Sequence, residues 1–160
     1  MSYILFISEQ RLKDSTAIGL NVDPSLLLPY VRQSQKLYCE PKIGSQLNLK
    51  LKNEIVAGTL SGAYKTLVDD YISDMLVNWA FFHAVPFLRF RVEGGNIFSK
   101  TSETGTPLST EEAQSLREEI SNTAQYYTER MIEYITNNLE RPSRQGTKLT
   151  LRNFLTSDLT

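Results

Sequence analysis

The chain has 160 residues, of which 41% are hydrophobic and 22% charged, a composition typical of one globular domain with a buried core. Its formal net charge of −1 argues against a general nucleic-acid binder, because such proteins carry a basic excess. The single cysteine, Cys39, excludes an intrachain disulfide and fits a reducing compartment. The sequence predicts no membrane span, since no apolar run approaches about 20 residues. It also predicts no signal peptide, because the apolar start Tyr3–Ile7 is short.

The first part of the chain, residues 1–20, is predicted to be an extended docking segment. Its apolar run Tyr3–Ile7 suits a short strand. Ser8 is placed to cap one or two helical turns that reach Thr16, and Gly19–Asn21 then breaks the chain.

A pair of short helices is expected next. Asp23 is a good N-cap and Pro24 fits the first helical position, where a missing N–H costs nothing. We expect Pro29 to divide a first turn from the main helix, which runs from Tyr30 to about Glu40, and Pro41 to end that helix. A second helix is expected over Pro41–Ala57, followed by Gly58 as a left-handed C-terminal cap.

The third helix has the clearest pattern in the chain. Its apolar residues recur at helical spacing, which predicts one buried face: Tyr64, Leu67, Val68, Tyr71, Ile72, Met75, Leu76 and Trp79. The polar residues that fall off this stripe are Asp69, Asp70, Ser73, Asp74 and Asn78. Residues 80–85 are apolar nearly all round, so this end should be buried on several sides, and Pro86 should kink or stop the helix.

A short β-hairpin is predicted around the paired glycines Gly94-Gly95, because glycine tolerates the positive φ of tight turns. The polar stretch Ser99–Leu108 is predicted to be a loop. Ser109 and Glu112 then form a capping box for a long amphipathic helix that is expected to reach Leu139, before Pro142.

The stretch 141–160 is predicted to be an extended docking tail, in which polar and apolar residues alternate after Lys148. An isolated strand is not stable in water, so the apolar residues at both ends need a partner. The candidate interface residues are therefore Ile4, Leu5, Phe6, Leu149, Leu151, Phe154 and Leu155. The partner could be their own domain, a neighbouring subunit or the sheet edge of another protein, and the two ends could also pair with each other.

Catalytic chemistry has little support in the sequence. His83 is the only histidine, which excludes a histidine-rich metal site, and it is expected to be a hydrogen-bonded core residue. Cys39 is expected to be a core thiol rather than a nucleophile. Adjacent carboxylates such as Asp69-Asp70 or Glu118-Glu119 point about 100° apart on a helix and are expected on solvated faces. The sequence therefore predicts no enzyme, no catalytic or metal site and no cofactor.

One segment resembles a known family. The stretch Val22–Leu47 has an Asp23-Pro24 start, a helix from Tyr30 to Tyr38 and a restart at Ile43-Gly44. It resembles the head-to-tail connector (adaptor) proteins of tailed bacteriophages, most of all those of phages that infect gut Bacteroidetes. The residues that carry this resemblance are Asp23, Leu28, Pro29, Tyr30, Gln35, Gly44 and Leu47. The order of elements extends the resemblance over roughly residues 8–140.

The resemblance implies a non-enzymatic structural subunit of the virion neck, made in the cytoplasm of the bacterial host. Such subunits form a ring, typically of twelve copies, which binds the portal protein and downstream neck or tail proteins. The ring extends a channel through which DNA passes without sequence-specific binding. The alternative is a small helical protein-binding module or assembly helper outside the virion. Either way, we expect a mainly α fold: a small helical bundle over 1–140, with a short β-hairpin and extended terminal segments.

Overall fold

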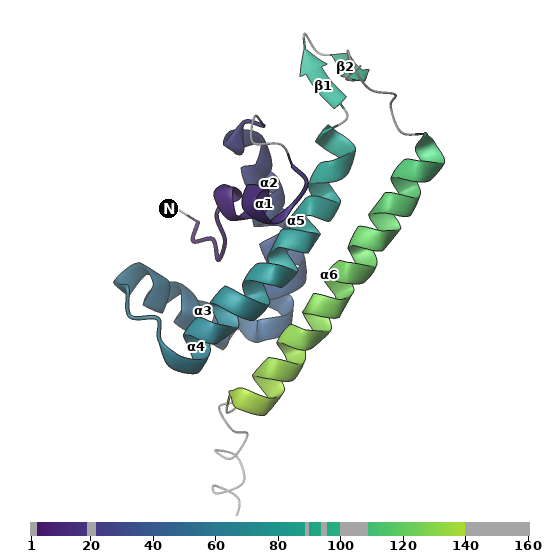
Figure 1. Cartoon of the computed structure of the whole chain (residues 1–160). Helices are drawn as coiled ribbons and strands as arrows, with labels where there is room; N and C mark the ends of the chain where they lie inside the picture. Colours follow the sequence, from purple (N-terminus) through teal and green to yellow (C-terminus); the bar gives the residue numbers. More distant parts are fainter. Residues whose placement is uncertain (1–2, 19–21, 89, 94–95, 100–108, 140–160) are drawn as a thin grey trace, which may run out of the picture.

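The computed structural model describes residues 3–18, 22–88, 90–93, 96–99 and 109–139. The predicted mainly α class is confirmed, since helices make up most of these residues. The long helices α5 (Ser73–Leu88) and α6 (Thr110–Asn138) lie side by side, and α2 (Pro24–Ser34) packs on another side of α5 (Figure 1). Most of the predicted loop and the whole of the predicted tail, 141–160, lie outside the described residues.

The first helix, α1 (Glu9–Ser15), begins where the sequence predicts. The backbone N–H of Arg11 donates to Ser8 Oγ at 3.1 Å, so Ser8 is the cap. The start of α2 is also confirmed, because the N–H of Ser25 donates to Asp23 Oδ1 at 2.8 Å and Pro24 opens the helix.

The predicted breaks at Pro29 and Pro41 are both wrong. α2 passes through Pro29 without interruption, and helical turns continue through a π-helical segment, η1 (Gln35–Cys39), into α3 (Glu40–Ala57). The wider turns of η1 place Pro41 in the first turn of α3, where a missing N–H is tolerated.

The actual break lies at Gly44, inside α3. Its φ of 79° and ψ of 162° fall in a region that is open almost only to glycine. The position at which the helix is interrupted is therefore set by this glycine. At the other end of α3, Gly58 adopts the predicted left-handed cap, with φ 67°.

The third predicted helix is observed as three consecutive segments: α4 (Gly62–Thr66), the π-helical η2 (Leu67–Ile72) and α5. The apolar stripe is confirmed as the buried face, with Leu67, Ile72, Met75 and Leu76 fully buried. Two details differ from expectation. Ser73 is buried rather than wet, because Arg11 of α1 covers it and donates through Nε to Ser73 Oγ at 3.2 Å. α5 also continues two residues past Pro86, so Pro86 does not stop the helix.

Two short strands follow α5. β1 (Phe90–Glu93) and β2 (Asn96–Ser99) pair antiparallel, with Phe90 opposite Ser99 and Glu93 opposite Asn96. The strands lie beyond the end of α5, at the end of the molecule where α6 begins (Figure 1).

The last helix, α6, has the predicted capping box. The N–H of Glu112 donates to Ser109 Oγ at 3.1 Å, and the N–H of Ser109 donates to Glu112 Oε2 at 2.7 Å. Over 29 residues α6 is about 43 Å long at 1.5 Å per residue. It therefore runs along the whole of α5 and covers its apolar face.

The apolar N-terminal segment packs on its own domain, one of the alternatives that the sequence leaves open. Phe6 is only 8% exposed and belongs to the core. The fully buried side chain of Gln35 holds the segment: Gln35 Oε1 accepts from the N–H of Phe6 at 2.9 Å, and Nε2 donates to the carbonyl of Ile4 at 3.0 Å. Next to it, Tyr3 donates through its hydroxyl to Glu40, which also accepts from Lys52 Nζ at 2.7 Å.

Replacing Gln35 by alanine should lower the free energy of unfolding by about 3 kcal/mol, because two backbone groups lose their partner in a buried place. Urea unfolding followed by circular dichroism measures this. Gln10→Ala is the matched control, since Gln10 is exposed and donates to the nearby exposed Asp14; it should change stability by less than about 0.5 kcal/mol. A Gln35→Ala protein as stable as the control would contradict this role of Gln35.

Candidate functional site

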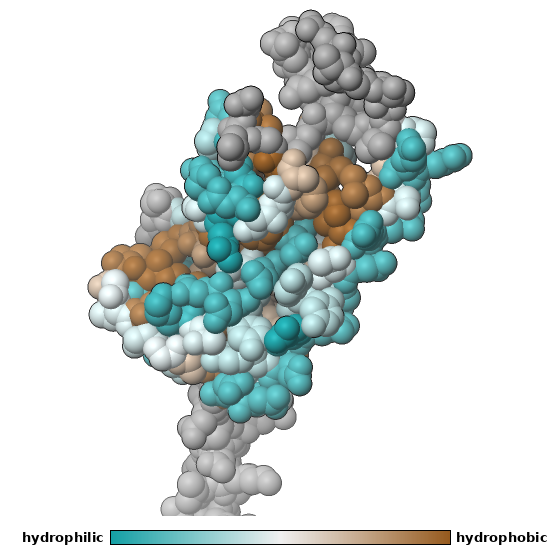
Figure 2. Space-filling view, in the orientation of Figure 1, coloured by the Kyte–Doolittle hydropathy of each residue, from teal (hydrophilic) through white to brown (hydrophobic). Residues whose placement is uncertain are grey.

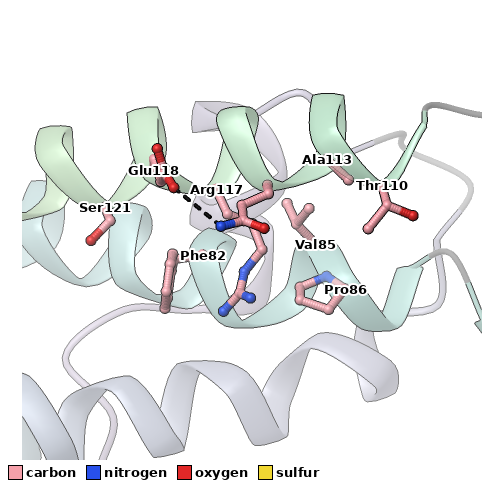
Figure 3. Close-up of a pocket in the computed structure, with 9 residues that line it drawn as sticks. Phe82, Val85, Pro86, Thr110, Ala113, Arg117, Glu118 and Ser121 are labelled. Carbon is pink, nitrogen blue, oxygen red and sulfur yellow. Dashed lines mark hydrogen bonds between the residues drawn. The ribbon is translucent and has the colours of Figure 1, made fainter.

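A groove lies between the C-terminal half of α5 and the N-terminal part of α6. Its volume is about 570 Å³. Figure 3 shows α5 contributing Phe82, Val85 and Pro86 on one side, opposite Thr110 and Ala113 of α6. The remaining lining residues also come from α6: Gln114, Arg117, Glu118 and Ser121.

Arg117 crosses the groove from α6 toward α5 (Figure 3). Its guanidinium lies 4.5 Å from the centre of the Phe82 ring, which is a cation–π contact. Its Nε is buried and has no hydrogen-bond partner among the described residues. A buried donor without a partner costs free energy, so this atom is a place where an incoming acceptor would be favourable.

One carboxylate, Glu118, lines the groove beside the guanidinium of Arg117. α6 also carries Glu111 and Glu112 in its first turn, where the helix dipole stabilises negative charge, and Glu119 next to Glu118, but these three do not line the groove. All four side chains are exposed, as the sequence predicts. Hydrogen bonds from Ser109 hold the pKa of Glu112 below its usual value. Gln114 Nε2 donates to Glu118 Oε1 at 3.4 Å, which leaves that carboxylate on the rim.

An aromatic stack supports the groove from within the fold. The rings of Tyr38 and Trp79 are 3.7 Å apart between centroids and nearly parallel. Trp79 Nε1 donates to Thr128 Oγ1 at 2.9 Å, which ties α5 to α6. Phe82 meets the ring of Trp79 edge-on, so the floor of the groove is fixed by the core.

His83 and Cys39 have different surroundings. The side chain that contacts His83 Nε2 is the hydroxyl of Tyr38, at 3.1 Å. Burial lowers the pKa of His83, and the nearby positive charge of Arg117 lowers it further. Cys39 is fully buried, and burial raises the pKa of its thiol to about 12. His83 is hydrogen-bonded, as predicted, but only partly buried, because it lies at the edge of the stack.

A second groove, of about 820 Å³, lies where α3 meets the C-terminal end of α6. Ile132 and Ile135 of α6 line it together with Leu139, which caps that helix, and the chain around Gly44 lines the other side. Lys42 and Lys50 also line this groove, and Lys50 Nζ pairs with Glu54 Oε1 at 2.6 Å.

Several large apolar side chains are exposed outside the grooves. Val56 is 71% exposed near the end of α3, and Phe87 is 58% exposed at the end of α5, where it stacks on Tyr30. Figure 2 shows hydrophobic surface over these two separate regions, one at the far end of α3 and one over the end of α5 beside α6.

The interface residues predicted from the sequence fall into two groups. Ile4 and Leu5 are partly buried, and Phe6 is a core residue whose side chain has little surface left for a partner. Leu149, Leu151, Phe154 and Leu155 lie outside the described residues, so their role stays a prediction.

Sequence reasoning missed the groove and Arg117. The groove joins residues of two helices that are about 30 positions apart in the chain, and no local pattern reports which faces meet. The one available signal was Arg117 itself, a long charged residue beside the apolar position Leu116.

Within the described residues, no three His, Cys, Asp or Glu side chains gather as metal ligands would. None of the described helices is both long and apolar enough to cross a bilayer.

The geometry defines a mainly helical protein whose notable surface features are apolar grooves and exposed apolar side chains rather than a cluster of reactive groups. The chain belongs to a family described as a family of unknown function (DUF6712), whose model matches residues 37–147. That range contains the last three residues of η1, all of α3 to α6 and both grooves. No curated protein and no solved structure matches the chain.

The Cys39 thiol should react very slowly with Ellman's reagent in the folded protein at mildly alkaline pH, because the thiolate is the reactive form and burial disfavours it. The same protein in concentrated guanidinium chloride is the control and should react fast. Rapid labelling of the folded chain would show that Cys39 is accessible and ionised.

Acidification should destabilise the protein partly through His83. Because the folded-state pKa is lowered, the unfolded state binds more protons, so the free energy of unfolding should fall between about pH 7.5 and 5.5. His83→Gln should make this slope smaller, since it removes the only histidine. Urea unfolding across this pH range measures the slope for both proteins, and equal slopes would contradict the assignment.

Proposed function

We propose that this protein is a structural subunit of a phage neck, a head-to-tail connector ring that joins the portal to the tail and extends the DNA channel. The observation that carries the proposal is the resemblance of the Val22–Leu47 segment to connector proteins. The residues behind that resemblance have defined structural roles, which supports it: Asp23 caps α2, Gln35 holds the N-terminal segment and Gly44 breaks α3.

The order of elements supports the same proposal. Two helices near the start lead to a long helix, two short paired strands and a long closing helix, which is the order on which the wider resemblance rests. A helical domain of this kind would form the folded body of each subunit, and the terminal segments would contact neighbouring proteins.

The surface supports assembly into a larger particle. A ring needs two different, complementary patches on each subunit, because its contacts are head-to-tail. This chain exposes apolar side chains at both the end of α3 and the end of α5. The net charge of −1 would suit a channel through which DNA passes without being held by its phosphates.

The second candidate is a small helical protein-binding module or assembly helper that is absent from the finished virion. The same grooves and exposed apolar side chains favour it, since they would serve any protein partner. The two candidates differ in where the protein is found and in how many copies.

Quantitative mass spectrometry of purified virions separates them. A connector should be present in a fixed ratio to the portal protein, close to one to one if both rings have twelve copies. Portal and major capsid peptides from the same sample are the internal controls. Absence from virions, with the protein abundant in infected cells, would favour the assembly helper.

A further inference from the structure

We propose that the outer face of α6 docks on the Tyr3 side of a neighbouring copy of this chain. The contact joins an acidic row, Glu129 and Glu133, to a basic cluster, Arg32 and Lys36 beside the ring of Tyr3. The inference rests on the proposed ring, for which it supplies the contact between subunits.

Three positively charged side chains surround the ring of Tyr3. The Arg32 guanidinium and the Nζ atoms of Lys36 and Lys52 lie 5.3, 5.1 and 4.6 Å from its centre. Lys52 is paired with Glu40 at 2.7 Å. Arg32 and Lys36 are exposed, and no carboxylate of the described residues forms an ion pair with either of them. The basic cluster therefore presents two uncompensated charges on one side of the molecule.

The acidic row lies on the side of α6 that faces away from the core. The buried positions Ala124, Thr128 and Met131 mark the inner side of this helix. Glu129 and Glu133 fall on the opposite side of the same turns, and both side chains are exposed. Neither forms an ion pair within the part of the chain that the structure describes.

Neighbouring groups on α6 leave the charge of the acidic row in place. Gln125 Nε2 donates to Glu129 Oε1 at 3.4 Å, and an amide adds no positive charge. Arg130 follows Glu129 in the chain, but its guanidinium lies over the ring of Tyr71, 5.7 Å from the centre. The row is therefore available to a cation from another molecule.

The two surfaces match in spacing and in sign. The residues of each pair are four positions apart, which is about 6 Å along a helix, so two ion pairs could form side by side. The wider surfaces are also of opposite charge. α6 carries six Glu against two Arg, whereas α2, η1 and α3 together carry five Lys and Arg against two Glu. Such complementarity steers association and sets which surfaces meet.

Exposed apolar side chains adjoin both charged pairs. Leu37, which follows Lys36, is 53% exposed, and Ile132, which precedes Glu133, is 41% exposed. Exposed ion pairs contribute at most about 1 kcal/mol each. Burial of these apolar side chains in the contact would therefore supply part of its free energy.

The shape of the molecule favours a neighbouring copy over the same chain. Figure 1 shows the N-terminal segment and α6 on opposite sides of α5. The acidic row faces away from α5, so it cannot reach the basic cluster of its own chain. A contact between two different surfaces of the same subunit is head-to-tail, and repetition of it closes into a ring when the rotation between subunits allows.

The first test places the contact by chemical crosslinking. An equimolar mixture of unlabelled and isotope-labelled full-length chains, concentrated at low salt, is treated with a zero-length carbodiimide and analysed by mass spectrometry. Links from Lys36 to Glu129 or Glu133 should join a labelled to an unlabelled chain. The exposed intrachain pair Lys65–Asp69 is the internal control and should link only within one label. Absence of mixed-label links between the cluster and the row would overturn the proposal.

The second test exchanges the charges and measures self-association by sedimentation velocity. Arg32→Glu/Lys36→Glu and Glu129→Lys/Glu133→Lys should each associate more than about tenfold more weakly than the wild type, because like charges then face each other. An equimolar mixture of the two variants should recover association, since every contact in it can again pair opposite charges. Circular dichroism checks that each variant is folded.

Glu111→Lys/Glu119→Lys is the matched control, because it makes the same change of charge on exposed residues of α6 outside the row. It should associate as the wild type does. A mixture no better than its separate components would overturn the proposal, and so would loss of association in the control. A DNA fragment bound by the wild type but not by Arg32→Glu/Lys36→Glu, with self-association unchanged, would assign the cluster to nucleic acid instead.

Failure here is distinguishable from failure of the connector proposal. Charge variants that still formed a ring on the portal, each without its counterpart, would refute this contact and leave the connector role intact. Mixed-label links in a protein that is absent from virions would support the contact and refute the connector role.

Discussion

The burial of α5 is the constraint on which the rest of the structure depends. This helix is apolar nearly all round, so it has to be covered on more than one side. α2 packs on one side and α6 along another, while Trp79 of α5 stacks on Tyr38 of η1 and donates to Thr128 of α6. The groove lies at the C-terminal end of α5, where α6 begins.

Local features of this fold could be predicted from the sequence. The caps at Ser8, Asp23 and Ser109 and the stripe from Leu67 to Trp79 depend on residues close together in the chain. The predictions that were wrong concern residues whose structure depends on their wider surroundings. Ser73 is buried because Arg11 of α1 covers it. The helical turns continue from η1 through Pro41 into α3, and the backbone departs from helical geometry at Gly44 instead.

The site was harder to predict than the fold. Gln35 is polar, yet it is fully buried, since it satisfies the backbone of a segment about 30 residues earlier. The groove also depends on a contact between distant residues, because Phe82 of α5 meets Arg117 of α6. Both depend on long-range contacts, which hydrophobic periodicity does not encode. The exposed carboxylates of α6, by contrast, follow directly from its amphipathic pattern.

The most direct test of the connector role is co-assembly of the full-length protein with the portal ring from the same source, viewed by negative-stain electron microscopy. The isolated protein is a poor substitute, because a ring of this kind can need a template to form. Our account predicts an additional ring stacked on the portal, with the symmetry of the stack visible in end views. Portal rings that stay bare at high protein concentration, with both termini of the chain intact, would contradict portal binding.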